Sequence, residues 1–299
     1  MSLPPPRPAE DAFLSDRMLS VRHAPGRSGV PKAVFIHGLG GSSLNWTDLM
    51  LLMADDVDGY AVDLHGFGGS PPSRDGGASP EDHARAVATF IDEVLGGEAV
   101  HVLGNSLGGA VALQLAARRP DLARSLTLVS PALPSTRITR STMHMPVIAI
   151  PGVGDQFMGR YRQLPVRHRV LGTIELCMVD PSRLPRQRVE EAIADQASRD
   201  DVPYVADEFL RSLRGLLATY LDRSSERPWK LAERVTCPTL AVYGLQDPLV
   251  DPKSAHRITK HFRNADVLVI TDSGHVAQME HPELVYEAWK RVCAERPAP

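Results

Sequence analysis

The chain has 299 residues, of which 43% are hydrophobic and 23% are charged. This length suits one large α/β domain with an inserted subdomain, and the composition is ordinary for a soluble globular protein. The formal net charge of −3 gives no electrostatic reason to expect nucleic acid or an anionic membrane as a partner.

The chain opens with residues 1–12, a proline-rich stretch without an apolar run long enough for a signal peptide, and we expect a flexible lead there. No later stretch approaches the roughly 20 apolar residues that span a bilayer. The three cysteines, Cys177, Cys237 and Cys293, show neither disulfide nor zinc-ligand spacing. These features favour a cytoplasmic protein without a disulfide framework or a structural zinc.

Short apolar, β-branched runs alternate with helical patterns, which predicts a mostly parallel sheet covered by helices on both faces. Strands are expected at 33–37, 59–62, 99–103, 126–129, 239–243 and 267–270, with 17–23 as an antiparallel edge strand. Helices are expected near 44–54, 79–95, 107–118, 253–263 and 282–294. The second helix has Ser79 as a capping residue and Pro80 in its first turn, which are typical of a helix start.

The alternation stops between residues 133 and 234, where helical patterns occur at 186–198 and 204–221 but no clear strand. The preceding stretch, 143–158, is apolar and interrupted by proline and glycine. We interpret residues 133–234 as a helical cap inserted into a core made of 13–132 and 235–299, and lying over the ends of the strands. A helical layer packed elsewhere, without substrate contact, is the alternative.

The turn Gly104-Asn-Ser106-Leu-Gly108 connects the strand at 99–103 to the helix at 107–118. A sharp strand-to-helix turn holds a serine in a strained conformation with its hydroxyl exposed, and flanking glycines leave room for it. The positive end of the following helix stabilises a developing negative charge. This pattern predicts Ser106 as a nucleophile.

A serine nucleophile needs a histidine base and an acid that orients the base. His275 lies in a loop between the last strand and the last helix, from which its side chain can reach back over the sheet. Asp247 directly follows the strand at 239–243, and Asp251 competes with it four residues later. Both aspartates fit the chain order serine, acid, histidine, and Asp247 is preferred because it follows the strand directly in a turn that leaves its carboxylate free.

The tetrahedral intermediate needs backbone N–H donors for its oxyanion. One is expected from Leu107, the residue after the nucleophile. The second is expected from the loop after the strand at 33–37, where glycines allow close approach to the substrate. In that loop Leu39 is the preferred donor and Gly40 the alternative.

Five motifs resemble those of the α/β-hydrolase fold superfamily and lie in the order found there. They are His37-Gly-Leu-Gly-Gly, Asp63-Leu-His-Gly-Phe-Gly-Gly-Ser70, Gly104-Asn-Ser106-Leu-Gly108, Gly244-x-x-Asp247 and Gly274-His275. The resemblance covers residues 30–130 and 235–295. It implies an eight-stranded, mostly parallel sheet with a cap, acyl-enzyme chemistry on Ser106, and no metal or organic cofactor. It also implies a structural turn at 63–70.

Three functions remain open from the sequence. The first is a carboxylic ester hydrolase for a small molecule with an apolar acyl or alcohol group. The second is a carbon–carbon hydrolase, which typically has an aromatic residue where Val276 stands and needs a cationic anchor such as Arg160, Arg162, Arg167 or Arg169. The third is a ligand receptor with little turnover. A serine nucleophile argues against the epoxide hydrolase and haloalkane dehalogenase branches, which use an aspartate. Substrate contacts are expected from Gly38, Gly40, Asn105, Met143 and Val276, and the sequence leaves the oligomeric state open.

Overall fold

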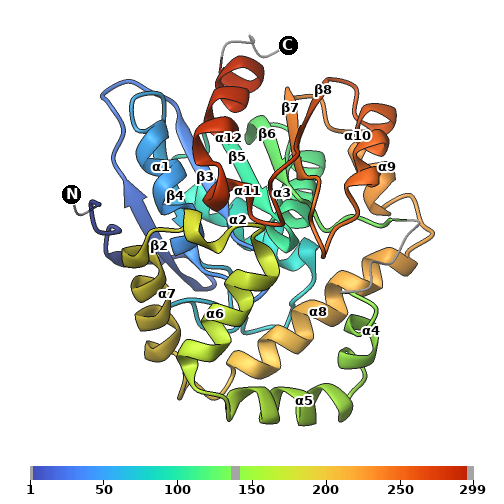
Figure 1. Cartoon of the computed structure of the whole chain (residues 1–299). Helices are drawn as coiled ribbons and strands as arrows, with labels where there is room; N and C mark the ends of the chain where they lie inside the picture. Colours follow the sequence, from blue (N-terminus) through green and yellow to red (C-terminus); the bar gives the residue numbers. More distant parts are fainter. Residues whose placement is uncertain (1–2, 136–141, 295–299) are drawn as a thin grey trace.

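A computed structural model, which describes residues 3–135 and 142–294, contains an eight-stranded sheet with helices on both faces (Figure 1). The strands lie in the order β1-β2-β4-β3-β5-β6-β7-β8. They are β1 Ala9–Phe13, β2 Met18–Ala24, β3 Lys32–Ile36, β4 Asp58–Val62, β5 Val100–Asn105, β6 Ala123–Val129, β7 Thr239–Gly244 and β8 Ala265–Ile270. All neighbours from β4 to β8 pair in parallel, whereas β2 is antiparallel to both β1 and β4. The predicted fold class is therefore confirmed.

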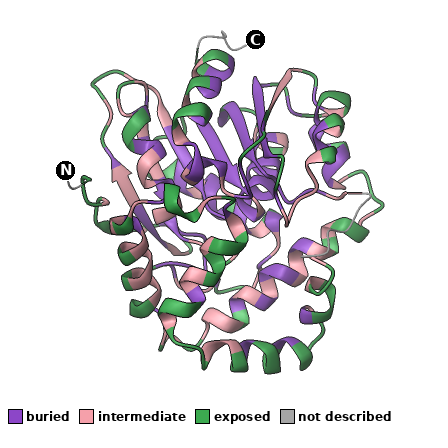
Figure 2. Cartoon of the chain, viewed as in Figure 1, coloured by how far each residue is buried: buried purple, intermediate pink, exposed green. Residues whose placement is uncertain are grey.

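The central strands are buried on both faces, as Figure 2 shows. Along β3, Val34 and Ile36 belong to one hydrophobic cluster, and Ala33 and Phe35 belong to another. Alternate side chains of a strand point to opposite faces, so the two clusters are the two faces of the sheet. The first cluster includes side chains of four helices, α2 Pro80–Glu93, α3 Leu107–Arg118, α9 Pro228–Ala232 and α10 Ala255–His261. The second cluster includes side chains of three helices, α1 Thr47–Met53, α11 Ala277–Glu280 and α12 Pro282–Trp289.

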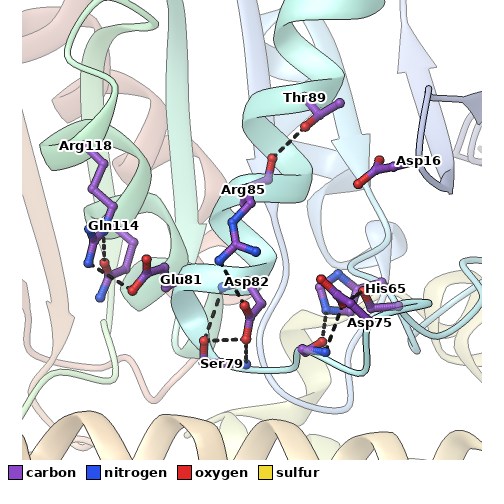
Figure 3. A network of polar contacts seen from close by, with 12 residues as sticks. Asp16, His65, Asp75, Ser79, Glu81, Asp82, Arg85, Thr89, Gln114 and Arg118 are labelled. Atoms are coloured by element: carbon purple, nitrogen blue, oxygen red, sulfur yellow. Dashed lines mark hydrogen bonds and ion pairs between the residues drawn. The ribbon is translucent and has the colours of Figure 1, made fainter.

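The start of α2 follows the sequence prediction (Figure 3). The Ser79 hydroxyl accepts a hydrogen bond from the Asp82 N–H at 3.2 Å, and the Asp82 carboxylate accepts one from the Ser79 N–H at 3.0 Å. Pro80 occupies the first turn, where no backbone donor is required. This reciprocal cap fixes where the helix begins.

The prediction of a flexible lead over residues 1–12 is wrong for the last part of that stretch. Ala9–Phe13 form β1, which pairs with β2 in an antiparallel hairpin from Ala9 opposite Arg22 to Phe13 opposite Met18. The Leu14 N–H donates to the Arg17 carbonyl at 2.7 Å and closes the turn. The strand was not anticipated because it is an edge strand with almost no buried side chain, so it lacks an alternating apolar pattern.

Among the described residues, five α-helices follow β6 and precede α9. They are α4 Met145–Ile148, α5 Val153–Arg162, α6 Val166–Cys177, α7 Arg186–Ser198 and α8 Val205–Leu221. The helices predicted at 186–198 and 204–221 are confirmed as α7 and α8 within a residue, whereas α5 and α6 were not predicted. These helices lie together at one end of the sheet and are more exposed than the sheet itself (Figures 1 and 2). Over the residues described, no helix is both long and apolar enough to cross a membrane.

Candidate active site

Ser106 stands at the junction of β5 and α3 in a strained backbone conformation, with φ 55° and ψ −117°. Such a conformation costs a non-glycine residue about 1–3 kcal/mol. The chain reaches it because Gly104 and Gly108 allow close packing. A Cβ on Gly104 would lie 2.2 Å from the Gly108 carbonyl oxygen, and one on Gly108 would lie 2.1 Å from that of Ile36. The turn thus has the geometry expected of a nucleophile elbow.

Asp247 and His275 form a buried pair, with Asp247 Oδ2 2.9 Å from His275 Nδ1. The other Asp247 oxygen accepts the N–H groups of Leu249 and Val250 at 2.8 and 2.9 Å. Burial by itself raises the pKa of the Asp247 carboxyl, but the His275 ring and these N–H donors outweigh it and hold the pKa below its ordinary value. Asp247 is therefore ionised at neutral pH and can accept a hydrogen bond from a proton on Nδ1 of the His275 ring.

The competing carboxylate, Asp251, lies at the start of a short 3₁₀ helix. Its side chain accepts a hydrogen bond from the Lys253 N–H at 3.0 Å and caps η3, Pro252–Ser254. The choice of Asp247 over Asp251 agrees with this geometry.

The structure brings the Ser106 turn to the His275 loop through Asn105. The Asn105 amide nitrogen donates to the carbonyl oxygens of Val129 and His275, at 3.1 and 3.0 Å. Across residues 3–135 and 142–294, no hydrogen bond joins the Ser106 hydroxyl to the His275 ring. The Asn105 side chain, from which a substrate contact was expected, thus joins the two loops through its amide nitrogen.

The predicted oxyanion donors lie on the two loops that meet at Ser106. Leu107 is the first residue of α3, so its N–H has no acceptor within the helix. On the other side, a Cβ on Gly38 would lie 3.1 Å from Ser106 Cβ, which places the 38–41 loop against the nucleophile. His37 holds this loop. Its Nε2 accepts from the Leu64 N–H at 3.0 Å, so Nδ1 carries the proton and donates to the Gly38 carbonyl at 2.7 Å.

Three more residues were expected to contact substrate, namely Gly40, Val276 and Met143, and they differ in how far they are buried. Gly40, with φ 76°, lies against the Phe209 ring of α8 at 3.3 Å from its ideal Cβ position. Val276 is half-buried at the start of α11. Met143, from which a substrate contact was also expected, is 63% exposed on the turn before α4. Met158 belongs to the apolar cluster of α4, α5 and α8, and Met145 and Leu39 pack against it.

The segment from Asp63 to Ser70 is the structural turn that the sequence predicts. Asp63 Oδ1 accepts the Ser43 N–H at 2.6 Å, Oδ2 accepts the Gly69 N–H at 2.9 Å, and the Ser70 hydroxyl donates to the Asp63 carbonyl at 2.7 Å. Both carboxylate oxygens of Asp63 are thus used in holding loops together.

Two site features had no interpretable sequence signal. The carbonyl of Cys177, at the end of α6, accepts the His275 N–H at 2.7 Å. Glu280 follows His275 by five residues and is buried among backbone donors. The sequence contains both residues, but only the tertiary structure shows what they contact.

The architecture and these loops match a known family. The sequence corresponds to the family described as alpha/beta hydrolase fold over residues 34–282. The chain belongs to the alpha/beta hydrolase fold family. Among its described residues, no three or more histidine, cysteine or acidic side chains are grouped so that they could hold a metal ion.

Relatives of this α/β hydrolase differ in their activities. It is 31% identical over 266 residues to the dihydrolipoyllysine-residue acetyltransferase component of the acetoin cleaving system of Cupriavidus necator, covering 88% of this chain and 63% of that protein's length. It is 28% identical to pimeloyl-acyl-carrier-protein methyl ester esterase of Neisseria meningitidis, covering 85% of this chain and 90% of that one. It is 27% identical to a 2-hydroxy-6-oxononadienedioate/2-hydroxy-6-oxononatrienedioate hydrolase of Cupriavidus pinatubonensis, covering 85% and 83%.

Solved structures of the same fold include two hydrolases. Naproxen esterase from Bacillus subtilis superposes with a TM-score of 0.67 at 21% identity, over 96% of this chain and 92% of that one. The 2-hydroxy-6-oxo-6-phenylhexa-2,4-dienoate hydrolase of a Rhodococcus species superposes with a TM-score of 0.73 at 22% identity, over 95% and 99%. At these identities the likeness shows the fold.

Proposed function

We propose that this α/β hydrolase is a serine esterase that cleaves a carboxylic ester through an acyl-enzyme on Ser106. The observation that carries the proposal is the buried Asp247–His275 pair, 2.9 Å apart, beside a strained serine turn. An esterase among the relatives supports it.

In the proposed mechanism, His275 Nε2 removes the proton as the Ser106 oxygen attacks the ester carbonyl. The negative charge on the carbonyl oxygen is stabilised by the N–H groups of Leu107 and Leu39, and by the positive end of α3. The protonated His275 then donates its proton to the departing alcohol. Water, deprotonated by the same ring, releases the acid and restores the serine.

The inserted segment 133–234 acts in this proposal as a cap that selects the acyl or alcohol group. Its helix α8 reaches the oxyanion loop, where Phe209 lies against Gly40 and Leu39 packs on the apolar cluster of α4, α5 and α8. An apolar surface beside the reacting carbonyl favours substrates with apolar groups. Residues 136–141 of this segment lie outside the described residues.

The proposal is tested by replacing Ser106 with alanine. Native protein is expected to hydrolyse short-chain p-nitrophenyl esters, and Ser106→Ala is expected to lower kcat by about 10³-fold or more with the fold intact, by the usual behaviour of triads. Ser198→Ala, at an exposed serine of α7, is the matched control and should keep native activity. Equal rates in the native and Ser106→Ala proteins would rule out the serine mechanism.

Carbon–carbon hydrolysis is the second candidate, because one relative, from Cupriavidus pinatubonensis, and one similar structure, from a Rhodococcus species, have that activity. This reaction needs a free cation for the substrate carboxylate, but three of the four arginines that the sequence offers as an anchor bond to other protein groups. Arg167 pairs with Glu190 at 3.0 Å, Arg169 pairs with Asp200, and Arg162 donates to the Asp200 carbonyl. These contacts favour ester hydrolysis over carbon–carbon hydrolysis. Preferential cleavage of a vinylogous 1,5-diketone over p-nitrophenyl esters would reverse the choice.

A further inference from the structure

We propose that Glu280 is a positioning residue for His275, which joins the His275 loop to the chain segment after α6. The naming of His275 as the base rests on the proposed function. The contacts themselves do not.

The Glu280 carboxylate, 4% exposed in α11, accepts four hydrogen bonds from two separate segments. Oε1 accepts the N–H groups of Val179 and Asp180, both at 2.8 Å. Oε2 accepts the Gly274 N–H at 2.7 Å and the Ser273 hydroxyl at 3.2 Å. The carboxylate therefore bridges the end of α6 to the two residues that precede His275.

The chemistry of these four partners requires a carboxylate. Every partner presents a donor, and an ionised carboxylate has only acceptor sites, about four of them. A glutamine has the same shape, but its NH₂ group would face either the Val179 and Asp180 donors or the Gly274 donor. Bonds from N–H groups to a charged acceptor are also roughly twice as strong as neutral ones. Glutamine is thus a near-isosteric change that removes one side of the bridge.

Direct contacts tie the same two segments together beside the carboxylate. The His275 N–H donates to the Cys177 carbonyl at 2.7 Å, and a Cβ on Gly274 would lie 2.4 Å from that oxygen. Further out, Arg183 in η2, Pro181–Arg183, pairs with Asp272 at 2.6 Å. The segment after α6 and the His275 loop are therefore packed as one unit, with Glu280 at its buried centre.

This arrangement links the position of His275 to that of the inserted helices. A base must be held within about 0.5 Å of its productive position, and a misplacement of about 1 Å costs roughly 10²-fold in rate. Loss of the Glu280 bridge should therefore reduce the chemical step and leave substrate binding nearly unchanged.

The experiment compares Glu280→Gln with native protein, with Glu287→Gln, at an exposed position of α12, as the matched control. For Glu280→Gln we expect kcat for a p-nitrophenyl ester to fall about 10–100-fold, by analogy with the loss of other residues that orient a functional histidine. We expect KM within about twofold of native, and covalent labelling of Ser106 by a fluorophosphonate slowed in parallel with kcat. The control should match native protein in all three.

A second measurement needs no substrate. The His275 Nδ1–H proton, bonded to Asp247, is expected to give a downfield signal in the proton NMR spectrum, assigned by its loss in His275→Gln. In Glu280→Gln this signal should shift or broaden. Ser273→Ala deletes one of the four donors and is expected to show a smaller effect in the same direction, which keeps the test available if Glu280→Gln does not fold.

The outcomes separate the two proposals. If folded Glu280→Gln keeps native kcat, labelling rate and proton signal, the positioning role is wrong. If native protein hydrolyses no ester while the signal still changes in Glu280→Gln, the proposed function fails and the positioning role stands. A loss of thermal stability with unchanged kcat would mean that Glu280 is only structural and would also overturn the positioning role.

Discussion

Gly104 and Gly108 bring the Ser106 turn closer to its neighbours than any residue with a side chain allows. In both cases the atom that a Cβ would meet is a backbone carbonyl oxygen, of Gly108 and Ile36 respectively. A flexible side chain could move aside, but these carbonyls belong to the helix start and the central strand. The strain at Ser106 is therefore maintained by close packing of the backbone on both sides of it.

Gly104→Ala is expected to lower the free energy of unfolding by about 1–3 kcal/mol, because overpacking a rigid core costs that much. Gly159→Ala is the control. It lies within α5 with nothing near its Cβ position, and alanine there should raise the free energy of unfolding by about 0.5–1 kcal/mol. Urea denaturation followed by circular dichroism measures both. Equal effects of the two substitutions would contradict the packing argument.

The residues of the candidate site differ in how far the sequence predicts them. Ser106, Asp247 and His275 each directly follow a strand pattern, so their meeting at one edge of a parallel sheet is predictable. The preference for Asp247 over Asp251 depended on its place directly after the strand, and the 2.9 Å contact with His275 supports it structurally. Glu280 had no predictable role, because its partners Val179 and Asp180 lie about 100 residues away and contribute backbone N–H groups, which leave no mark in a sequence.

At the scale of elements, the central strands β3, β5, β6 and β7 were predictable because they are buried on both faces and so are rich in apolar residues. The helix α8 was predictable because one face carries buried apolar side chains at helical spacing. In contrast, α5 and α6 are mostly exposed, and each buries at most two of its residues, so no apolar stripe marks them. Pro151 and Pro165 stand just before these two helices, and a proline in a sequence can indicate the end of a helix as well as its start.

The helix α7 is held to the core by ion pairs. Arg188, 7% exposed, donates to Asp48 of α1 through Nε and Nη2 at 2.9 and 2.7 Å, and to Glu191 at 2.8 Å. A second set joins Asp195 to Arg199 at 2.6 Å and to the Ser42 hydroxyl at 3.1 Å. These contacts attach α7 to residues 42–48, which directly follow the 38–41 loop.

Arg188→Met is expected to lower the free energy of unfolding by about 1.5–3 kcal/mol, because it removes charge-assisted hydrogen bonds from a nearly buried group and leaves two carboxylates close together. Arg167→Met breaks the exposed pair with Glu190 and should cost less than about 1 kcal/mol. Chemical denaturation of both variants provides the comparison. A loss from Arg167→Met as large as that from Arg188→Met would show that burial does not set the strength of these pairs.

For the molecule as a whole, four buried histidines couple folding to pH. Burial lowers the pKa of His65 to about 4 and that of His101 to about 3, and it also lowers the pKa of His37 and His83. His83 lies within α2 and is fully buried, with Nε2 3.1 Å from the Ser212 hydroxyl. His65 lies near the start of α2, with Nε2 2.8 Å from the Gly77 carbonyl (Figure 3).

The sign of this coupling follows from proton binding. An unfolded histidine has a pKa of about 6.5, so between about pH 6.5 and pH 4 the unfolded chain binds protons at these positions and the folded chain does not. The free energy of unfolding must therefore fall as the pH falls through this range, by up to about 1.4 kcal/mol per pH unit for each such histidine. Carboxylates with a lowered pKa, such as Asp247, add to the loss only at lower pH.

His101→Gln is expected to reduce the slope of unfolding free energy against pH between pH 6 and 4.5. The reduction is up to about 1.4 kcal/mol per pH unit, because the substitution removes one group that takes up a proton only on unfolding. The substitution also costs stability at pH 7.5, where the Ser125 contact of 2.7 Å and the packing on Trp289 are lost, so the slope and not the absolute value carries the test. His256→Gln, at an exposed position of α10, is the matched control and should keep the native slope. Denaturation series at several pH values give the slopes directly. Stability that stays constant in the native protein from pH 7 to pH 4.5 would mean that the buried histidines gain protons in the folded state, and the low pKa values assigned to them would then be wrong.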